Sequence, residues 1–225
     1  MNISNLKGKL VISVQAAYGE PLYEEACING LLKSVVNGGA SAVRVAGVRD
    51  VKNAKRLLDV PVVGLTKPKF LPDNWMDVVY ITPTMNDIES LLNAGADVVA
   101  LDATNRERNF KLQEAVTLIH SHGKFAMADI SSFEEGMLCT DLGFDIISTT
   151  LSGYTTETKT DSKSPDFELL ENLTKNTNVP VFLEGRVWEP YHVKRAFELN
   201  AHSVVIGSAI TRPQLIVKRF MEESK

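Results

Sequence analysis

Seven apolar segments of this chain each end on a side chain that could bind or transform a polar ligand. If the segments are parallel strands, their carboxyl ends share one rim of a sheet, and ligands of such proteins bind at that rim. The chemistry available there is proton transfer by an amine or a carboxylate and hydrogen bonding by amide, hydroxyl and guanidinium groups. The residues that end the seven segments are Gln15, Arg44, Lys67, Asp102, Asp129, Glu184 and Ser208.

Lys67 is a candidate for moving a proton. It ends the apolar segment 62–66, and Pro68 favours an extended conformation for it. Most lysines are solvated surface residues, but a lysine partly removed from water has a lowered pKa and can serve as a general base. Lys69 lies two residues further on and could point the same way, so spacing leaves both lysines open.

Three of the seven residues, Asp102, Asp129 and Glu184, are carboxylates. Three carboxylates on one rim could bind a divalent metal, but none of the four histidines ends an apolar segment. The ligand set therefore predicts no metal site and favours binding of sugar hydroxyls with acid–base work. A carboxylate beside Lys67 would favour the charged amine and oppose the effect of desolvation on its pKa.

Three other polar residues could contact the same ligand. Gln15 and Arg44 offer an amide and a guanidinium, which suit an oxygen-rich molecule. Arg44 could instead only form an ion pair across the mouth of the sheet. Tyr154 could cover the ligand or merely pack within its own loop.

The C-terminal third carries a candidate anion site. Two glycines end apolar segments, and an arginine follows each of them closely. In eight-stranded βα barrels the loops after strands seven and eight often bind phosphate through backbone N–H groups, and arginine adds charge-assisted hydrogen bonds. The alternative is a pair of tight turns. The predicted phosphate-binding residues are Gly185, Arg186, Gly207, Ser208 and Arg212.

A helix-to-strand joint recurs four times along the chain. At 37–41, 93–97, 141–145 and 199–203, a helical pattern ends near a glycine or asparagine, and an apolar run follows a polar residue. This alternation predicts a parallel sheet with helices outside it. Eight such units in this length favour a closed (β/α)8 TIM barrel of the phosphate-binding type over an open sheet.

The apolar runs and helical patterns assign the elements. The apolar run 78–81 lacks a preceding helix, so it is interpreted as part of a loop after the third strand, on the catalytic face. The predicted strands are 11–15, 42–46, 62–67, 98–103, 125–130, 146–151, 181–185 and 204–208. The predicted helices are 22–36, 50–58, 85–93, 111–122, 132–142, 166–175, 190–199 and 213–222.

Composition limits the functional class. The 225 residues, 44% of them hydrophobic, suit one domain over 1–225. The net charge of -4 argues against nucleic-acid partners and a polybasic membrane role. Two cysteines outside any cluster, with no signal peptide and no apolar stretch long enough for a membrane, predict free thiols in a soluble cytoplasmic protein.

Motifs spread over almost the whole chain resemble the bacterial N-acetylmannosamine-6-phosphate 2-epimerase family. The most specific are Thr-Thr-Leu-Ser-Gly-Tyr-Thr at 149–155 and Gly-Ser-Ala-Ile-Thr-Arg at 207–212. The resemblance implies a (β/α)8 enzyme of sialic acid breakdown that needs no metal or nucleotide cofactor and interconverts N-acetylmannosamine 6-phosphate and N-acetylglucosamine 6-phosphate. The other matching stretches are 13–15, 43–44, 63–67, 100–104, 127–129, 148 and 184–186.

The resemblance also implies roles for the residues. Catalysis falls on Lys67 and Glu184, substrate binding on Gln15, Arg44 and Asp129, and phosphate binding on the residues predicted above. The substrate partner would be a phosphorylated N-acetylhexosamine, and family members are often oligomers, which predicts a homodimer. This chain departs from the family by carrying Pro68-Lys69-Phe70 after the lysine and Val14 before the glutamine.

Two alternatives stay open at this point. Another phosphosugar isomerase on the same barrel, such as one for phosphoribosyl substrates, would share the phosphate site but usually depends on a pair of aspartates. A non-catalytic phosphosugar-binding protein would keep the site and perform no reaction. Proton exchange at C2 of the sugar separates the enzyme from the binding protein.

Overall fold

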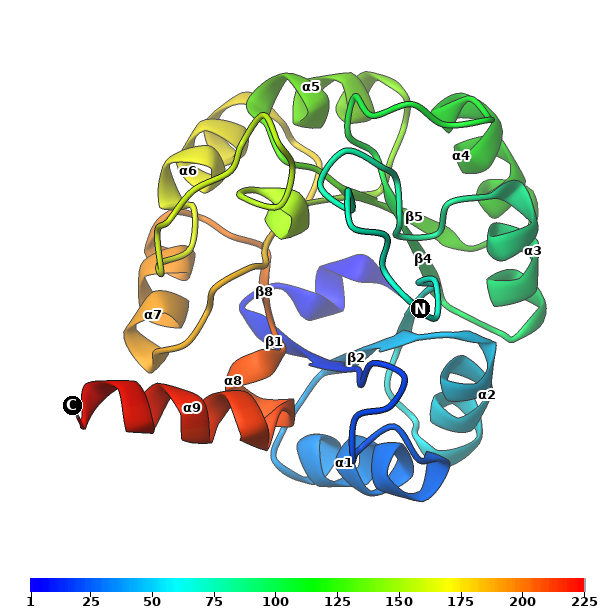
Figure 1. Ribbon diagram of the computed structural model, residues 1–225. Helices are drawn as coiled ribbons and strands as arrows, with labels where there is room; N and C mark the ends of the chain where they lie inside the picture. Colours follow the sequence, from blue (N-terminus) through cyan, green and yellow to red (C-terminus); the bar gives the residue numbers. More distant parts are fainter. Residues whose placement is uncertain (225) are drawn as a thin grey trace.

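The chain folds as a closed barrel of eight parallel strands, hydrogen-bonded in sequence order from β1 to β8 and back to β1 (Figure 1). The computed structural model describes residues 1–224. The predicted (β/α)8 barrel is confirmed. The strands are β1 (Lys9–Val14), β2 (Ala42–Ala46), β3 (Val62–Leu65), β4 (Val98–Asp102), β5 (Phe125–Asp129), β6 (Ile146–Ser148), β7 (Val181–Leu183) and β8 (Ser203–Ile206).

Helices surround the barrel as an outer ring (Figure 1). A 3-10 helix, η1 (Ile3–Leu6), precedes β1, and a second one, η2 (Thr149–Leu151), follows β6. The α-helices are α1 (Glu25–Asn37), α2 (Val48–Leu57), α3 (Met85–Asn93), α4 (Leu112–Ser121), α5 (Phe133–Asp141), α6 (Phe167–Asn176), α7 (Pro190–Glu198), α8 (Ser208–Thr211) and α9 (Pro213–Glu223).

The strands bury both of their faces, which explains why they are apolar throughout. One set of side chains, such as Val11, Val63 and Phe182, fills the barrel interior. The alternate set, such as Val45 and Val99, packs beneath the helices. Gly64 lets α2 and α3 approach β3, because a Cβ there would lie 3.0–3.2 Å from side chains of both helices and of Ala96.

The recurring helix-to-strand joint has one conformation. Gly39, Gly95 and Gly143 have φ values of +100°, +92° and +82°, and Asn200 adopts the same left-handed region at the fourth joint. Glycine and asparagine tolerate this region better than other residues. The four joints therefore end the helices as predicted and direct the chain into the next strand.

Seven of the eight predicted strands extend too far at their carboxyl ends, whereas the prediction for β2 is confirmed at both ends. Strand β3 ends at Leu65, β7 ends at Leu183 and β6 ends at Ser148, where η2 takes over. Beyond these ends the backbone bonds to rim side chains instead of a neighbouring strand: the Thr66 N–H donates to Thr82 Oγ1 and the Glu184 N–H donates to Thr149 Oγ1. Gln15, Lys67 and Glu184 consequently lie just beyond their strands rather than in them.

The segment 78–81 is a loop, as predicted, and it returns to the barrel. The Thr82 N–H donates to the Thr66 carbonyl oxygen over 3.0 Å, and the Asp102 N–H donates to the Ile81 carbonyl oxygen over 3.1 Å. Tyr80 and Ile81 are buried in the interior layer as a result. The β3–α3 loop therefore forms part of the wall at the carboxyl-end mouth of the barrel.

Candidate active site

Arg44 occupies the centre of the carboxyl rim and joins two carboxylates. Its guanidinium donates two hydrogen bonds to Asp129, at 3.0 Å to Oδ1 and 2.6 Å to Oδ2. Its Nη1 also lies 3.2 Å from Glu184 Oε2. Arg44 and Asp129 are almost completely buried. The ion pair across the mouth, one of the two alternatives for Arg44, is thus present.

The charge of Arg44 is held by these neighbours. Burial acts to lower the pKa of Arg44, but the negative charges of Asp129 and Glu184 outweigh burial and raise it. A buried charge of this kind persists only when paired. Arg44 therefore remains a fixed cation between β2, β5 and the end of β7.

Lys67 lies beside Gln15 at the mouth. Its Nζ donates to Gln15 Oε1 over 2.9 Å, and Gln15 Nε2 donates to Ser13 Oγ over 2.8 Å. Lys69 instead places its ammonium 3.7 Å from the centre of the Tyr18 ring. These contacts orient Lys67 toward the rim and Lys69 toward an aromatic side chain of the β1–α1 loop.

The environment of Lys67 lowers its pKa to about 8. The largest cause is desolvation, since protein atoms surround the ammonium group, although the side chain still meets solvent at the open mouth. The positive charge of Arg44 lowers this pKa further, whereas Glu184 and Asp129 oppose the change. The lowering effects prevail over the two carboxylates, a balance that residue types and spacing alone could not decide.

Glu184 has a raised pKa. Desolvation is the largest cause, the charge of Asp129 adds to it, and Arg44, Thr150 and Lys67 act in the opposite sense. Two carboxylates near one cation behave in this way because only one of them can be fully compensated. The rim therefore holds a carboxyl group that gains a proton more readily than usual and an amine that loses one more readily.

Thr150 belongs to this group of residues, although no pattern of residue types selects it in particular. Its Oγ1 lies 2.7 Å from Asp129 Oδ1, 2.8 Å from Ser148 Oγ and 3.1 Å from Glu184 Oε2. The signal available in the sequence was its place in the 149–155 motif. No periodicity argument could select it, because η2 rather than a strand presents its side chain.

The predicted phosphate-binding residues lie at the ends of β7 and β8. Gly185 and Arg186 have φ values of +100° and +56°, which reverse the chain direction after β7. Gly207 precedes α8, whose first residue is Ser208. The Thr211 hydroxyl donates to the Ser13 carbonyl oxygen over 2.8 Å and holds α8 against β1.

The two arginines of this region already have partners. Arg186 donates from Nε to the Ser164 carbonyl oxygen over 2.7 Å and from Nη1 to the Ser152 carbonyl oxygen over 2.6 Å. It thereby fastens the β6–α6 loop, and its guanidinium carbon lies 5.6 Å from the centre of the Tyr154 ring. Arg212 forms an ion pair with Glu20 of the β1–α1 loop.

Asp102 stands apart from Arg44 and its carboxylates. Its Oδ2 lies 2.5 Å from Arg106 Nη2, and its Oδ1 accepts from the Thr104 hydroxyl over 2.7 Å. Arg106 also donates to the carbonyl oxygens of Trp75 and Met76. Asp102 therefore acts through Arg106 to hold the β3–α3 loop in place.

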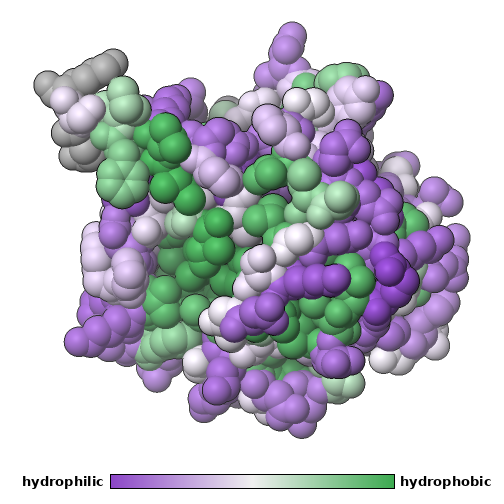
Figure 2. All heavy atoms as spheres, turned by 90° about the horizontal axis from the view of Figure 1, so that it is seen from below, coloured by the Kyte–Doolittle hydropathy of each residue, from purple (hydrophilic) through white to green (hydrophobic). Residues whose placement is uncertain are grey.

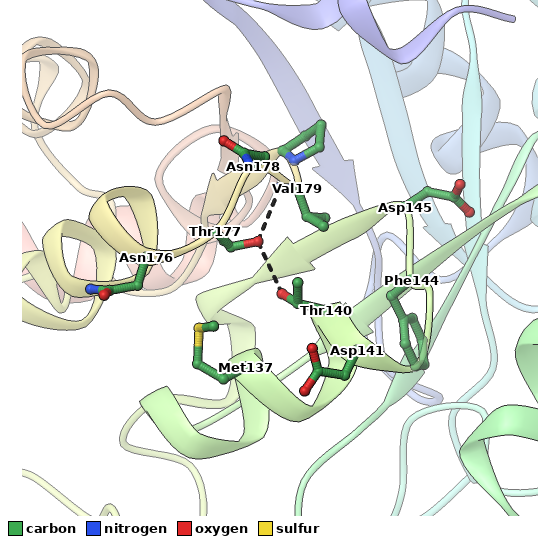
Figure 3. A pocket seen from close by; sticks show the side chains of 10 residues that line it. Met137, Thr140, Asp141, Phe144, Asp145, Asn176, Thr177, Asn178 and Val179 are labelled. Carbon is green, nitrogen blue, oxygen red and sulfur yellow. Dashed lines mark hydrogen bonds between the residues drawn. The ribbon is translucent and has the colours of Figure 1, made fainter.

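An open hollow of about 560 Å³ lies at the opposite end of the barrel, beside the amino ends of β6 and β7 (Figure 3). The hydroxyls of Thr140 and Thr177 meet there at 3.1 Å. Its lining contains none of the residues predicted for the site. The hollow is separate from the group around Arg44.

Fold and rim together define a class: a (β/α)8 barrel whose buried ion pair and ionisable side chains gather at the carboxyl ends of its strands. A family model described as "Putative N-acetylmannosamine-6-phosphate epimerase" matches residues 28–225. The chain belongs to this family.

Relatives and solved structures agree with that assignment. A "Putative N-acetylmannosamine-6-phosphate 2-epimerase" of Clostridioides difficile is 42% identical over 222 residues, which cover 98% of this chain and 97% of the relative. One from Clostridium perfringens is 43% identical over 219 residues, with 96% and 97% covered.

The solved structure of the N-acetylmannosamine-6-phosphate 2-epimerase from Clostridium perfringens superposes with a TM-score of 0.92 at 42% identity, over 99% of this chain and 96% of that one. A thiamine phosphate pyrophosphorylase from Pyrococcus furiosus, at 16% identity and a TM-score of 0.65, shares the fold alone.

Proposed function

We propose that this chain is an isomerase that interconverts N-acetylmannosamine 6-phosphate and N-acetylglucosamine 6-phosphate by removing the C2 proton and returning it on the opposite face. The observation that carries the proposal is the pairing of a lysine of lowered pKa with a carboxyl group of raised pKa around Arg44. Membership of the epimerase family is the reason for proposing these two sugar phosphates as substrate and product.

Lys67 is the proposed base. Opening of the sugar ring gives an aldehyde, which makes the C2 proton acidic because the resulting carbanion is delocalised as an enolate. With a pKa of about 8, about a tenth of Lys67 is neutral at pH 7 and able to accept that proton. Gln15 orients the amine through its 2.9 Å hydrogen bond.

Glu184 is the proposed second proton carrier. Asp129 is less suited to this role, since it is fully buried and both of its oxygens accept hydrogen bonds from Arg44. Glu184 keeps a side chain that is 14% exposed at the mouth. It would assist ring opening or proton return, while one lysine serves both faces after the open-chain sugar rotates.

The proposed phosphate site anchors the sugar during that rotation. Gly185 and Gly207 allow close approach of the backbone, and Ser208, Arg186 and Arg212 add donors. Phosphate would replace Glu20 as the partner of Arg212. Fixing a remote group in this way stabilises the transition state through positioning.

Arg44, Asp129, Gln15 and Tyr154 complete the proposed substrate site. Arg44 and Asp129 set the charge at the floor of the mouth, and Tyr154 lies beside Gly185, 3.8 Å from the position that a Cβ of that glycine would occupy. This reaction needs no metal and no nucleotide, and nucleic acid and membranes are not partners.

We also propose that the 225-residue chain forms one domain that pairs as a cytoplasmic homodimer. The pairing is inferred from α9, where Val217, Phe220 and Met221 are 61%, 73% and 58% exposed. Figure 2 shows apolar side chains gathered along and beside this helix. The free thiols of Cys27 and Cys139 suit a reducing compartment. None of the described helices is long and apolar enough to cross a membrane.

The test of the activity is direct conversion followed by NMR. Purified protein is mixed with N-acetylmannosamine 6-phosphate, with and without a metal chelator, and product formation is measured. We expect N-acetylglucosamine 6-phosphate to form at the same rate in both samples. Saturable binding of the sugar phosphate without conversion would instead establish a binding protein.

A further inference from the structure

The hydroxyl of Thr150 has more acceptors around it than it can serve. Asp129 Oδ1, Ser148 Oγ and Glu184 Oε2 all lie within 3.1 Å of Thr150 Oγ1. A hydroxyl carries one proton and therefore donates to one acceptor at a time. Ser148 can reverse roles and donate to Thr150, but an ionised carboxylate cannot. The Thr150 hydroxyl can therefore donate to Asp129 or to Glu184, but not to both at once.

The surroundings hold Thr150 in the position where this choice arises. The Thr149 hydroxyl donates to the Glu184 carbonyl oxygen over 2.9 Å and accepts from the Glu184 N–H over 3.1 Å. These bonds tie η2 to the residue after β7. Arg44 fixes the Asp129 carboxylate with two hydrogen bonds.

The contacts of the Glu184 carboxylate are made by one oxygen. Among residues 1–224, both Arg44 Nη1 and Thr150 Oγ1 lie close to Oε2, at 3.2 Å and 3.1 Å. This arrangement leaves Oε1 for exchange of a proton with the substrate. A change in the donor to Oε2 alters how readily Oε1 gains or loses that proton.

We propose that Thr150 is a positioning residue that switches its hydrogen bond between Glu184 and Asp129 as Glu184 loses and gains a proton. When Glu184 is ionised, Thr150 donates to Oε2 and stabilises the charge. When Glu184 is protonated, Thr150 donates to Asp129. The hydroxyl proton stays on Thr150 throughout, and only Glu184 exchanges a proton with the sugar. The inference rests on the proposed function.

The charged and titratable groups that face Glu184 come from several elements. Arg44 from β2, Lys67 after β3 and Asp129 from β5 face it, Tyr80 of the β3–α3 loop lies near Asp129, and Tyr154 of the β6–α6 loop lies near Gly185. Burial raises the pKa of Tyr80 well above its usual range, and the pKa of Arg44 is also raised. Lys67 has a pKa lowered to about 8, so the pH profile is read with the charge of Lys67 in view as well.

The test compares Thr150→Val with Thr150→Ser. Valine keeps the shape but has no donor, whereas serine keeps the hydroxyl. The rate of epimerisation is measured across pH for the wild type and both variants with one substrate, so that titration of the sugar phosphate is common to all. Circular dichroism and Tm show whether each variant is folded.

For Thr150→Val we expect the lower pKa of the kcat/KM profile to rise, by at most about one unit. Ionised Glu184 loses a donor that matters more to it than the Thr150 bond matters to Asp129, which Arg44 already bonds twice. The kcat should fall by about tenfold, with KM within twofold of the wild type, because Thr150 does not touch the sugar. Thr150→Ser should restore the wild-type pKa. An unmoved lower pKa in the valine variant, or serine behaving like valine, would overturn the proposal.

A substrate-free measurement separates this inference from the proposed function. The side-chain carboxyl carbon of Glu184 is titrated by 13C NMR in the wild type and in both variants. A higher pKa for Glu184 in Thr150→Val, reversed in Thr150→Ser, is expected even if the protein does not convert the sugar. Should the valine variant fail to fold, Thr150→Ala takes its place, and an unchanged Glu184 titration contradicts the switch.

Discussion

At the scale of single residues, Arg44 is the buried charge that acts on the pKa values of both Lys67 and Glu184. Its charge is matched by Asp129 in a bidentate pair, so that Glu184 receives only part of the compensation it would need. The same charge lowers the pKa of Lys67. Arg44 thus acts in the same direction on both groups: it lowers the pKa of Lys67 toward neutral, while the pKa of Glu184 is raised by desolvation and by Asp129 despite Arg44.

The lowered pKa of Lys67 predicts a pH-dependent cost to stability. Below about pH 8 the lysine is charged in both folded and unfolded chains. The folded state then bears the cost of the desolvated charge, reduced because Lys67 is exposed to solvent at the mouth. As pH rises above 8 the folded chain loses this proton before the unfolded chain does, so stability recovers with increasing pH. We expect Lys67→Met to melt slightly above the wild type at pH 7, with the difference shrinking toward pH 10.

The matched control for this experiment is Lys69→Met. The Lys69 ammonium lies over the Tyr18 ring rather than among the rim charges, so its removal should not raise Tm at pH 7. Thermal unfolding followed by circular dichroism at several pH values provides the measurement. A Lys67→Met variant that is no more stable than the wild type at pH 7 would show that Lys67 carries no desolvation penalty.

At the scale of elements, Arg186 connects the loops that follow β6 and β7. Gly153, with a φ of +85°, makes room for it, because a Cβ there would lie 2.5 Å from Arg186 Nη1 and 2.8 Å from Thr160 Cγ2. The β6–α6 loop and the proposed phosphate site therefore depend on each other. A substitution at Gly153 should therefore weaken binding at the proposed phosphate site.

Gly153→Ala tests this dependence. The left-handed conformation costs alanine about 1–2 kcal/mol, and the new methyl group must also displace Arg186. We expect a raised KM for the sugar phosphate, by about tenfold, together with a lower Tm. Gly123→Ala is the control, since Gly123 also has a positive φ, of +65°, but nothing lies within 4 Å of its Cβ position. Equal KM values for Gly153→Ala and Gly123→Ala would contradict a role of Arg186 in phosphate binding.

The elements also show what sequence reasoning could and could not predict. The eight strands and the helices between them follow from apolar runs and left-handed joints, both of which are local. The ends of the strands do not, because the chain leaves the sheet where side chains from several strands meet, as at Ser148 and Leu183. The sequence did not predict Thr150 as a site residue for the same reason, because its partners come from β5, β6 and the end of β7.

At the scale of the whole molecule, α9 stands out because none of residues 213–222 is buried. It extends to one side of the ring of helices (Figure 1), and an ion pair between Arg219 and Glu189 holds it beside α7. Its exposed apolar residues exceed what a solvated helix requires. A second copy of the chain would cover them.

Phe220→Glu tests the proposed homodimer. A charge in place of a side chain that is 73% exposed should leave the barrel folded and prevent apolar association, so light scattering after gel filtration should give about half the wild-type mass. Lys218→Gln, which also alters an exposed position of α9, should leave the mass unchanged. A wild type that is already monomeric would contradict the pairing through α9.

The central claim, that Lys67 moves the C2 proton, is tested most directly by isotope exchange. N-acetylmannosamine 6-phosphate is incubated in deuterated water with the wild type, Lys67→Ala or Lys69→Ala, and deuterium at C2 of both sugars is followed by NMR. We expect the wild type and Lys69→Ala to exchange C2 at rates within about threefold of each other, and Lys67→Ala to be slower by at least about 100-fold, the scale of a general base. Exchange by Lys67→Ala at the wild-type rate would contradict the role of Lys67 as the base.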